Sequence, residues 1–597
     1  MPYSDGDDGS QAHKQHGTGS LRRRKLLTAA GLAGATLIAG CSNSGDNVGG
    51  NVGNGGNGNG NGGNGNGGTS DAQTYFVTDV NTDPSSLDPH AVSIDEYTAW
   101  MSFPPNAYET LVFYDDENAE LVPLLANEVP TVDNGLIKND GQTFEFPLRE
   151  GVTFHTGGEM LAEDVEFSLN RVVDMGVSDG VRNVERIDEI EVTDDYRIQL
   201  TLNEPYISFL NGIVPRKDLT VVSKQAVEEN GGVQSGERNE WMAQNTAGTG
   251  PYYLEDWQRS QYIRWEAHED YWDPDSVGPQ GVFQHVVTEV STAVSMMQQG
   301  QLHYSERGVG DVESFQGTGA AFTPYESLDQ TFLFFNYDIP YDADGMPDDD
   351  DVDPDFFQDP NVRKAFGHAI DYEEYIEAAW DGYGYVSNQP CHLSPVFYYD
   401  EDAPNFEYDP ELVEEYLREA GYWDGGFTIT LMTEQISEFE NAILYIKDSM
   451  ESINGDITIN TQALSESEYL DRRGDTPWRM PMDVGGFPSF GPDPAGYYDE
   501  LFFGGIASGS RMSEYVSQEI FDLVEQAAAE PEEAAREEMY HELQSLCVDD
   551  PPVVALNGEN FVTIHAECAE PTINPAFEHQ VAKTWGIENC GDLNIDL

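Results

Sequence analysis

The sequence has few basic residues, few cysteines and few long apolar runs. Lysine and arginine total 28 against 109 aspartates and glutamates, which gives a formal net charge of -81 at pH 7. No basic stripe is present to neutralise phosphates, which argues against nucleic acid as a partner. The 5 cysteines among 597 residues show no CxxC spacing, which argues against zinc or dithiol chemistry. Beyond the N-terminal region, no apolar run is long enough to cross a membrane.

The acidity of the chain indicates adaptation to concentrated salt. Repulsion among so many carboxylates opposes a compact state at ordinary ionic strength. At about 1 M salt the Debye length falls to about 3 Å, and this repulsion is largely screened. The alternative, an acidic disordered chain, is disfavoured because 39% hydrophobic and 11% aromatic residues can form cores. The composition therefore predicts a folded protein of a halophile.

The N-terminal region resembles an export signal that ends in a lipid-attachment site. Residues 22–25, RRRK, precede a mostly apolar run that is too short for a membrane span, and the paired arginines resemble a twin-arginine signal. Ala39 and Gly40 directly before Cys41 resemble a bacterial-type lipobox, in which the cysteine is lipidated and becomes the new N-terminus. A buried or accidental cysteine behind an uncleaved anchor is the alternative. Position, small neighbours and charge order favour a lipoprotein signal over residues 1–41.

A glycine- and asparagine-rich segment follows the cysteine. Residues 42–72 hold almost no large apolar side chain, so they cannot bury enough surface to offset the entropy of ordering. We predict a flexible tether here and a folded body that begins near Gln73.

Patterns in the body predict a mixed α/β structure. Phe144, Phe146 and Leu148 alternate onto one face, as in a half-buried strand. Residues 187–202 predict a hairpin that turns at Asp194–Asp195.

A helix and a βαβ unit are predicted further along the chain. The stretch YDPELVEEYLREAGY predicts a helix with Asp409 as N-cap and Gly421 at its end. Residues 427–433, a helix that reaches Ile453, and residues 456–464 follow one another with short turns. Strand, helix and strand in this order predict at least one parallel sheet.

Motifs for catalysis or metal binding are missing. The chain contains no GxxxxGK[ST], no GxSxG and no HExxH. His155, Glu159 and Glu163 could suggest a metal, but an acid at a helix N-terminus is explained by the helix dipole. The acidic loop 340–351 partly matches a calcium loop, yet Pro340 occupies the first ligand position and has no oxygen to offer. We therefore predict no enzyme activity, no metal and no cofactor.

A series of motifs resembles the family 5 extracellular solute-binding proteins of ABC importers. The stretch FEFPLREGVTFHTGGEMLAEDVEFSLNRVV carries the signature of this family, which includes dipeptide-, oligopeptide- and nickel-binding proteins. Further landmarks follow in family order: SLDPH (86–90), YETLVFYD (108–115), LVPLLANEVP (121–130), NTAGTGPYYLEDW (245–257), MMQQGQL (296–302), DPNVRKAFGHAIDYEEYI (359–376) and YDPELVEEYLREAGY (408–422). The resemblance covers about residues 75 to 565.

The glycines of GTGPYYL are expected to adopt backbone angles closed to other residues. Val362, Phe366, Ala369 and Ile370 share one helical face and are expected to pack rather than bind.

The resemblance implies an α/β fold of the periplasmic-binding-protein type (type II, the three-lobe peptide-binding type), with a ligand cleft between two hinged lobes. It implies lobe I over residues 73–106, 244–335 and 555–597, an inserted lobe II over 107–243, and lobe III over 336–554. The hinge would lie at two crossings, near Phe335–Asn336 and Val554–Ala555. Ligand would be buried when lobes I and III close.

The resemblance also implies a function. The protein would capture a peptide by hinge closure and deliver it to the permease of an ABC transporter and, through it, to the ATPase. It would be a monomer, exported by the twin-arginine pathway and lipid-anchored at the outer face of the cytoplasmic membrane. A nickel chelate or an oligosaccharide as ligand, an extracellular hydrolase on this frame, and sensing through a chemoreceptor remain open alternatives.

The expected amine-binding acid is absent. In peptide-binding relatives an aspartate three residues before a DP dipeptide holds the α-amino group, but Phe490 occupies that position here. Asp493 belongs to the DP dipeptide and is expected either to bind ligand or to cap a turn. Aromatic residues near a cleft suit apolar groups, sugar faces or a chelate. The predicted ligand-binding aromatics, which could instead be core, are Trp100, Phe103, Tyr383, Tyr385, Trp478, Phe487, Phe490 and Tyr497.

Two further predictions concern cysteine and histidine. Cys568 and Cys590 either form a disulfide in the exported protein or remain buried free thiols. A nickel site would be tested first at His392, which follows Cys391.

Overall fold

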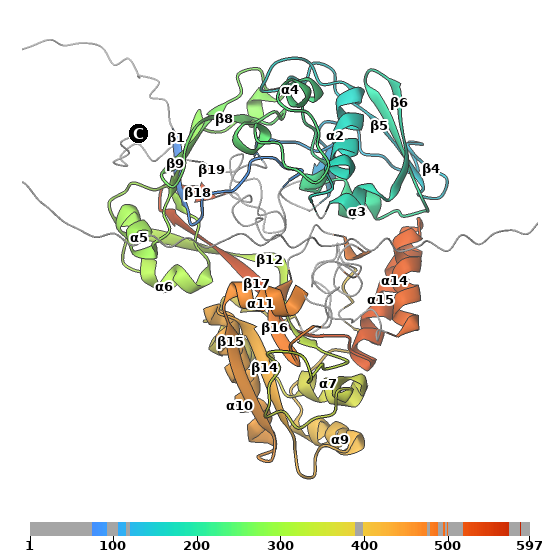
Figure 1. The fold of residues 1–597 in the computed structure, drawn as a ribbon, viewed down its shortest axis with the longest axis vertical. Coiled ribbons are helices and arrows are strands. Elements are labelled where there is room, and N and C mark those ends of the chain that lie inside the picture. The colour runs from blue at the N-terminus through green and yellow to red at the C-terminus, as the bar shows by residue number, and fades with distance from the viewer. Residues whose placement is uncertain are drawn as a thin grey trace, which may run out of the picture. The chain divides into compact units, whose positions relative to one another are not determined.

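A mixed sheet of eleven strands forms the centre of the computed structural model (Figure 1). Ten strands follow the order β15-β14-β16-β12-β17-β11-β1-β10-β9-β8, and β13 pairs with β17 beside this path. Their bounds are β1 Tyr75–Val80, β8 Tyr252–Gln258, β9 Tyr262–Ala267, β10 Gly281–Val286, β11 Tyr304–Ser305, β12 Ala320–Phe335, β13 Gly384–Tyr385, β14 Thr428–Glu434, β15 Thr458–Leu464, β16 Met482–Phe487 and β17 Val554–Ala566.

The structure describes most of the body of the chain. The described residues are 75–91, 106–114, 120–178, 180–387, 398–400, 402–474, 478–487, 493–495, 498, 517–571 and 585–586. The predicted signal, Cys41 and the predicted tether lie outside them. The same is true of Trp100, Phe103, His392, Phe490, Tyr497 and Cys590.

Two long strands connect the halves of the sheet. β12 and β17 pair antiparallel from Ala320 opposite Ala566 to Leu333 opposite Val554, with a register shift between Glu326 and Gln330. We call β11, β1, β10, β9 and β8 the first half, and β15, β14 and β16 the second half. Because β17 pairs with β11 and β12 pairs with β16, these two strands belong to both halves (Figure 1).

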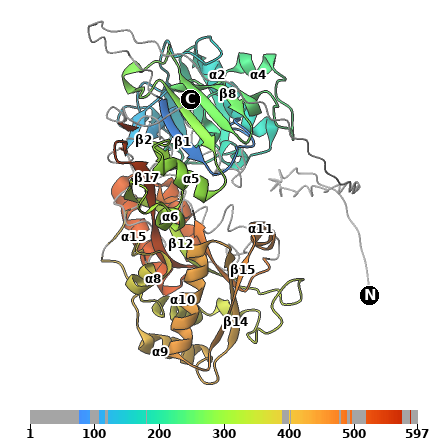
Figure 2. The same cartoon turned by 90° about the vertical axis from the view of Figure 1, so that its left-hand side faces the viewer.

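The predicted βαβ unit lies in the second half. β14 and β15 run parallel from Thr428 opposite Thr458, and α10 (Ser437–Ile453) connects them. Ala442, Ile443 and Met450 on the inner face of α10 are buried in the core, and Figure 2 shows α10 lying along these strands. The prediction of a parallel sheet is confirmed.

Local capping explains the helix at 410–420. The Asp409 side chain accepts hydrogen bonds from the backbone N–H groups of Glu411 and Leu412, at 2.9 and 3.1 Å. Gly421 ends α9 in the left-handed region, at φ 86°. Both predicted ends of α9 (Pro410–Ala420) are confirmed.

A separate sheet of four strands has the order β4-β5-β7-β6. Phe144, Phe146 and Leu148 are buried as predicted, and β6 and β7 form the predicted hairpin. Smaller sheets pair β2 with β3 and β18 with β19. The strand bounds are β2 Val112–Tyr114, β3 Leu121–Pro123, β4 Ile137–Lys138, β5 Thr143–Pro147, β6 Ile187–Asp194, β7 Arg197–Leu202, β18 Glu570–Pro571 and β19 Trp585–Gly586.

The remaining helices lie between the strands along the chain. The α-helices are α2 Ala162–Met175, α3 Val181–Val184, α4 Lys224–Glu229, α5 Val290–Gln298, α6 Val312–Phe315, α7 Pro360–His368, α8 Tyr372–Ala379, α11 Glu466–Gly474, α14 Gln518–Ala529 and α15 Glu533–Asp549. Short 3₁₀ turns are η4 Lys217–Leu219, η5 Met242–Gln244, η6 Pro274–Ser276, η7 Val309–Asp311 and η8 Phe356–Gln358, and η3 Phe209–Ile213 is a π-helix. Val362, Phe366, Ala369 and Ile370 are buried, as their spacing predicts.

The glycines of GTGPYYL have a different role from the predicted one. Neither Gly248 nor Gly250 has a positive φ, so the expectation of special backbone angles is wrong. A β-carbon at 248 would overlap the carbonyl of Ala107, and one at 250 would overlap the carbonyl of Asn106. These glycines allow two backbone segments to pack directly against each other.

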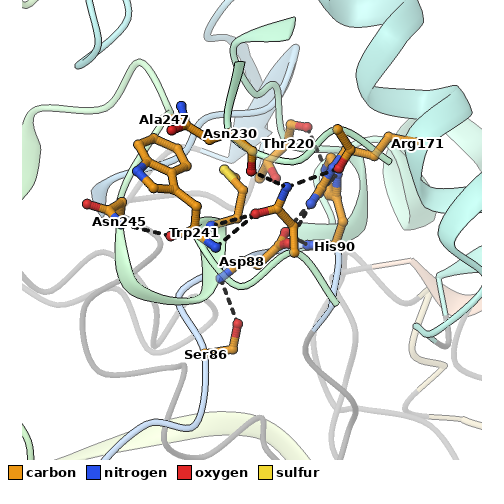
Figure 3. Close-up of polar contacts among 12 residues, drawn as sticks. Ser86, Asp88, His90, Arg171, Thr220, Asn230, Trp241, Asn245 and Ala247 are labelled. Atoms are coloured by element: carbon orange, nitrogen blue, oxygen red, sulfur yellow. Dashed lines mark hydrogen bonds and ion pairs between the residues drawn. The ribbon is translucent and has the colours of Figure 1, made fainter. Parts of the chain in front are cut away.

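A fully buried ion pair joins the segment after β1 to α2. The Arg171 guanidinium donates two hydrogen bonds to the Asp88 carboxylate, and both side chains have 0% exposure (Figure 3). Arg171 also donates to Nδ1 of His90 at 2.9 Å, so His90 carries its proton on Nε2 and donates to the Thr220 carbonyl at 3.0 Å. Burial and the Arg171 charge lower the pKa of His90 to about 4. The network is fully buried and structural, although Arg171 Nε has no hydrogen-bond partner among the described residues.

The described residues bear on the predictions about membrane spans and disulfides. No helix among the described residues is long and apolar enough to span a membrane. Cys568 forms a disulfide, and its partner lies outside the described residues. Cys547 is buried and is not part of a disulfide.

Candidate ligand-binding region

Several predicted site residues lie at β12 and β17, which we call the crossing strands because both pass from one half of the sheet to the other. β13, which contains Tyr385, pairs with β17 at Gly558, and a β-carbon at 558 would overlap the Tyr385 ring. The Tyr385 hydroxyl donates to the Ser327 carbonyl at 2.8 Å, and Gln330 donates to the Ser387 hydroxyl. Strand pairing and these hydrogen bonds therefore hold the segment that contains Tyr383 and Tyr385 against β12 and β17.

Glu559 is the unusual group of this region. It lies on β17, only partly exposed, and accepts a hydrogen bond from the Thr331 hydroxyl at 2.9 Å. Burial, followed by the charges of Asp329 and Glu438, raises the pKa of Glu559 to about 8, and the Thr331 bond lowers it. Among the described residues, the groups that act on its pKa are the carboxyls of Asp329 and Glu438 and the Thr331 hydroxyl. A cation placed beside Glu559 would favour the ionised form.

Glu438, whose charge acts on Glu559, also acts on Asp311 of the other half of the sheet. Glu438 belongs to the first turn of α10, and Asp311 belongs to η7, which follows β11. Burial raises the pKa of Asp311; the Arg307 charge lowers it and the Glu438 charge raises it. Arg307 itself donates to Asp79 at 2.9 Å and to the Val287 carbonyl. The local field is negative, which suits a ligand with a positive group.

The remaining predicted residues divide between the core and a second cluster. Phe487 ends β16 opposite Gln330, is 1% exposed, and its ring centroid lies 6.3 Å from that of Phe332. Trp478 is also 1% exposed, and its carbonyl accepts from Asn336 at 2.8 Å. Phe487 thus borders the crossing strands, whereas Trp478 packs inside the core of the second half.

Asp493 lies apart from the crossing strands. It is 5% exposed, and its Oδ1 accepts from the Ala495 N–H at 2.9 Å, as a turn-capping aspartate does. A β-carbon at Gly212 in η3 would lie 3.4 Å from its Cβ, and its charge acts on Arg536 and Tyr540 of α15. Asp493 therefore faces η3 and α15.

Sequence reasoning missed Asp311, Asp329, Glu438 and Glu559. Three of them are indistinguishable from the other acids of a chain with 109. Glu559 had one usable signal, because it interrupts the apolar stretch VVALNGENFVTIHA, where a charged residue points to a buried or paired carboxyl.

The histidine and glutamates considered for a metal have separate partners. His155 Nε2 donates to the Gly250 carbonyl at 2.9 Å, Glu159 accepts from the Tyr196 hydroxyl at 2.8 Å, and Glu163 pairs with a lysine. Across the described part of the chain, no group of three histidine, cysteine or acidic residues is placed to hold a metal ion.

Comparison with known proteins identifies the family. The family model described as bacterial extracellular solute-binding proteins, family 5 Middle, matches residues 120–509. The chain belongs to this family. Its resemblance to the family, predicted from the motifs, is confirmed, as is the prediction that it is not an enzyme.

Two curated relatives match this chain in sequence over most of its length, and one solved structure matches its fold. The oligopeptide-binding protein AppA of Bacillus subtilis is 24% identical over 461 residues, which is 74% of this chain and 79% of AppA. Heme-binding protein A of Haemophilus influenzae is 24% identical over 527 residues, 84% of this chain and 89% of that protein. The structure of DppA from Helicobacter pylori with the peptide STSA matches with a TM-score of 0.66 and 24% identity, over 85% of this chain and 97% of DppA.

A second solved structure extends the range of ligands among similar folds. NikZ from Campylobacter jejuni in complex with Ni(L-His) matches with a TM-score of 0.67 and 19% identity, over 86% of this chain and 99% of NikZ. The predicted α/β fold of the binding-protein type is confirmed. The chain is an extracytoplasmic solute-binding protein of an ABC importer.

Proposed function

We propose that the protein captures peptides with a free amino terminus and delivers them to an ABC transporter permease. The observation that carries this proposal is Glu559, a partly buried carboxyl whose pKa is raised and on which, among the described residues, carboxyl groups and one hydroxyl act. A peptide ammonium group beside Glu559 would supply the missing cation and replace the anchor absent at Phe490. Tyr383, Tyr385 and Phe487 would border the same ligand.

The proposed mechanism is hinge closure. Lobe I (73–106, 244–335, 555–597) and lobe III (336–554) are joined by β12 and β17, with lobe II (107–243) inserted into lobe I. The long pairing of β12 and β17 supports two crossings as a hinge, because few backbone angles need to change. A ligand that contacts both lobes favours the closed form.

Capture of peptides can be tested with a defined mixture. The purified protein in molar KCl is dialysed against a tryptic digest of casein, and bound peptides are identified by mass spectrometry. We expect retention of peptides from the native digest and loss of retention, by about tenfold or more, after N-acetylation of the same digest. Equal retention of both digests would contradict the role of the ammonium group. Retention of neither, with a nickel–histidine complex bound instead, would replace the peptide assignment.

Lipid anchoring is proposed at Cys41. Cys41→Ser removes the thiol to which a lipid is attached and is expected to move the protein from the membrane fraction to the supernatant of host cells. The measurement is an immunoblot of both fractions together with the mass of the mature protein. Cys547→Ser, which changes a buried thiol of α15 outside any disulfide, is the matched control. A membrane-bound Cys41→Ser variant would contradict lipidation at this residue.

A further inference from the structure

The two edges of the eleven-stranded sheet differ in how they are protected. β8 ends the described sheet on one side and β15 ends it on the other. The β8 edge contains Glu255 and Asp256, and its pairing with β9 shifts register between Leu254 and Asp256. The Thr246 hydroxyl also accepts a hydrogen bond from the Leu254 N–H at 3.2 Å. Charged side chains and irregular pairing keep an edge strand from pairing with a strand of another chain.

β15 has none of these features. Its sequence, TINTQAL, contains no charged residue and no proline, and all 7 of its residues pair with β14 without a register shift. A regular, uncharged edge strand is a template for pairing with a strand of another molecule. In molar salt the repulsion between acidic chains is largely screened, so net charge does not prevent such pairing. Any protection of this edge therefore has to come from outside β15.

The backbone of β15 points alternately toward β14 and toward the free edge. The Thr458 N–H and the Leu464 carbonyl hydrogen-bond, each at 2.8 Å, to the two residues that flank β14. Successive residues of a strand turn their backbone groups to opposite sides. The N–H and carbonyl groups of Ile459, Thr461 and Ala463 therefore face the free edge.

A lysine and a glutamate of α10 cover the first of these outward residues. Lys447 Nζ donates to the Ile459 carbonyl at 2.7 Å, and Glu451 Oε1 accepts from the Ile459 N–H at 3.0 Å. Lys447 and Glu451 also form an ion pair with each other, one helical turn apart on α10, which lies beside β15 (Figure 2). Burial alone would raise the pKa of Glu451, but hydrogen bonds with Lys447 and with the Ile459 N–H lower this pKa below its ordinary value. Glu451 thus stays an ionised acceptor at neutral pH.

We propose that Lys447 and Glu451 form an edge guard, which prevents the β15 strands of two copies of the protein from pairing. With the guard in place, the backbone groups of Thr461 and Ala463 are the outward groups of β15 without a hydrogen bond among the described residues. Without the guard, the free edge extends over three successive outward residues of a regular strand, which can pair with a second β15. The guard acts independently of the ligand and of hinge closure.

The test compares two double variants, each of which loses one positive and one negative charge, by sedimentation velocity in molar KCl. Lys447→Ala with Glu451→Ala removes the guard, and alanine is a good helix former, so α10 should stay folded. We expect about half of this variant to associate at about 100 μM, a concentration at which the native protein stays monomeric. Glu414→Ala with Arg418→Ala is the matched control, because these residues form an ion pair of the same spacing on α9. The control should stay monomeric.

A further substitution shows whether association uses the edge of β15. Thr461→Pro, added to the variant without the guard, removes an outward N–H and leaves the hydrogen bonds to β14 in place. It should therefore restore the monomer. The guard would be overturned by a monomeric Lys447→Ala, Glu451→Ala variant or by equal association of the control. Association that persists after Thr461→Pro would overturn it as well, because the contact would then lie elsewhere on the protein.

Discussion

Replacing Glu559 with glutamine is expected to weaken peptide binding by about tenfold and, at neutral pH, to stabilise the unliganded protein. Glutamine keeps the size and can accept from the Thr331 hydroxyl, but it lacks the charge that pairs with an ammonium group. A hydrogen bond to a charged partner contributes about 1.5–3 kcal/mol, which corresponds to a tenfold or larger change in affinity. Weaker binding would thus accompany higher stability of the unliganded protein. A variant that merely folds poorly would lose both binding and stability.

The sign of the stability change follows from the pKa of Glu559. The pKa is raised from 4.5 to about 8 in the folded protein, so between these values the native state binds more protons than the unfolded state. The contribution of Glu559 to native stability is therefore greatest below pH 4.5 and falls as the pH rises toward 8, by at most about 1.4 kcal/mol per pH unit. Glu559→Gln removes this dependence, so the variant should gain most over the native protein at pH 8 and nothing at pH 4.

The measurements are urea unfolding in molar KCl from pH 4 to 8 and binding of the casein digest. Glu567→Gln is the matched control, because Glu567 is an exposed glutamate just beyond the end of β17. Equal peptide affinity for Glu559→Gln and the native protein would contradict the anchor. A stability difference that is constant with pH would contradict the raised pKa.

Much of the fold is predictable because its determinants are local. Asp409 and Gly421 set the ends of α9 through hydrogen bonds and a φ that lie within one turn of each residue. The alternation of Phe144, Phe146 and Leu148 reflects the period of a strand and needs no knowledge of the partner strand. Gly248 and Gly250 show the limit, because the carbonyls they accommodate lie far away in the sequence, at Asn106 and Ala107.

The candidate ligand-binding region was less predictable because its groups come together only in three dimensions. Glu559 is perturbed by Asp329, on the adjacent strand in space, and by Glu438, at the start of a helix more than a hundred positions away. A single sequence contains no trace of that proximity. Trp478 illustrates the ambiguity of aromatic density, since a large ring suits a buried core as well as a cleft.

Replacement of Arg171 by methionine is expected to destabilise the protein by about 3–5 kcal/mol, because it leaves Asp88 charged, buried and without its partner. Methionine fills a similar volume, so the loss reports the stranded carboxylate rather than a cavity. His90 also loses a hydrogen-bond donor to its Nδ1. Urea unfolding in molar KCl at pH 7 measures the change.

A second arginine variant tests whether the loss comes from the stranded Asp88 carboxylate or from replacing any helical arginine. Arg418→Met in α9 is the matched control: Arg418 pairs with Glu414, but both side chains are nearly half exposed, so the expected cost is below about 1 kcal/mol. Adding Asp88→Asn to Arg171→Met removes the buried charge and should recover at least about 1 kcal/mol. No recovery would show that Arg171 acts through packing alone. None of the residues of the network belongs to the crossing strands. The folded fraction of Arg171→Met should therefore bind peptides with native affinity.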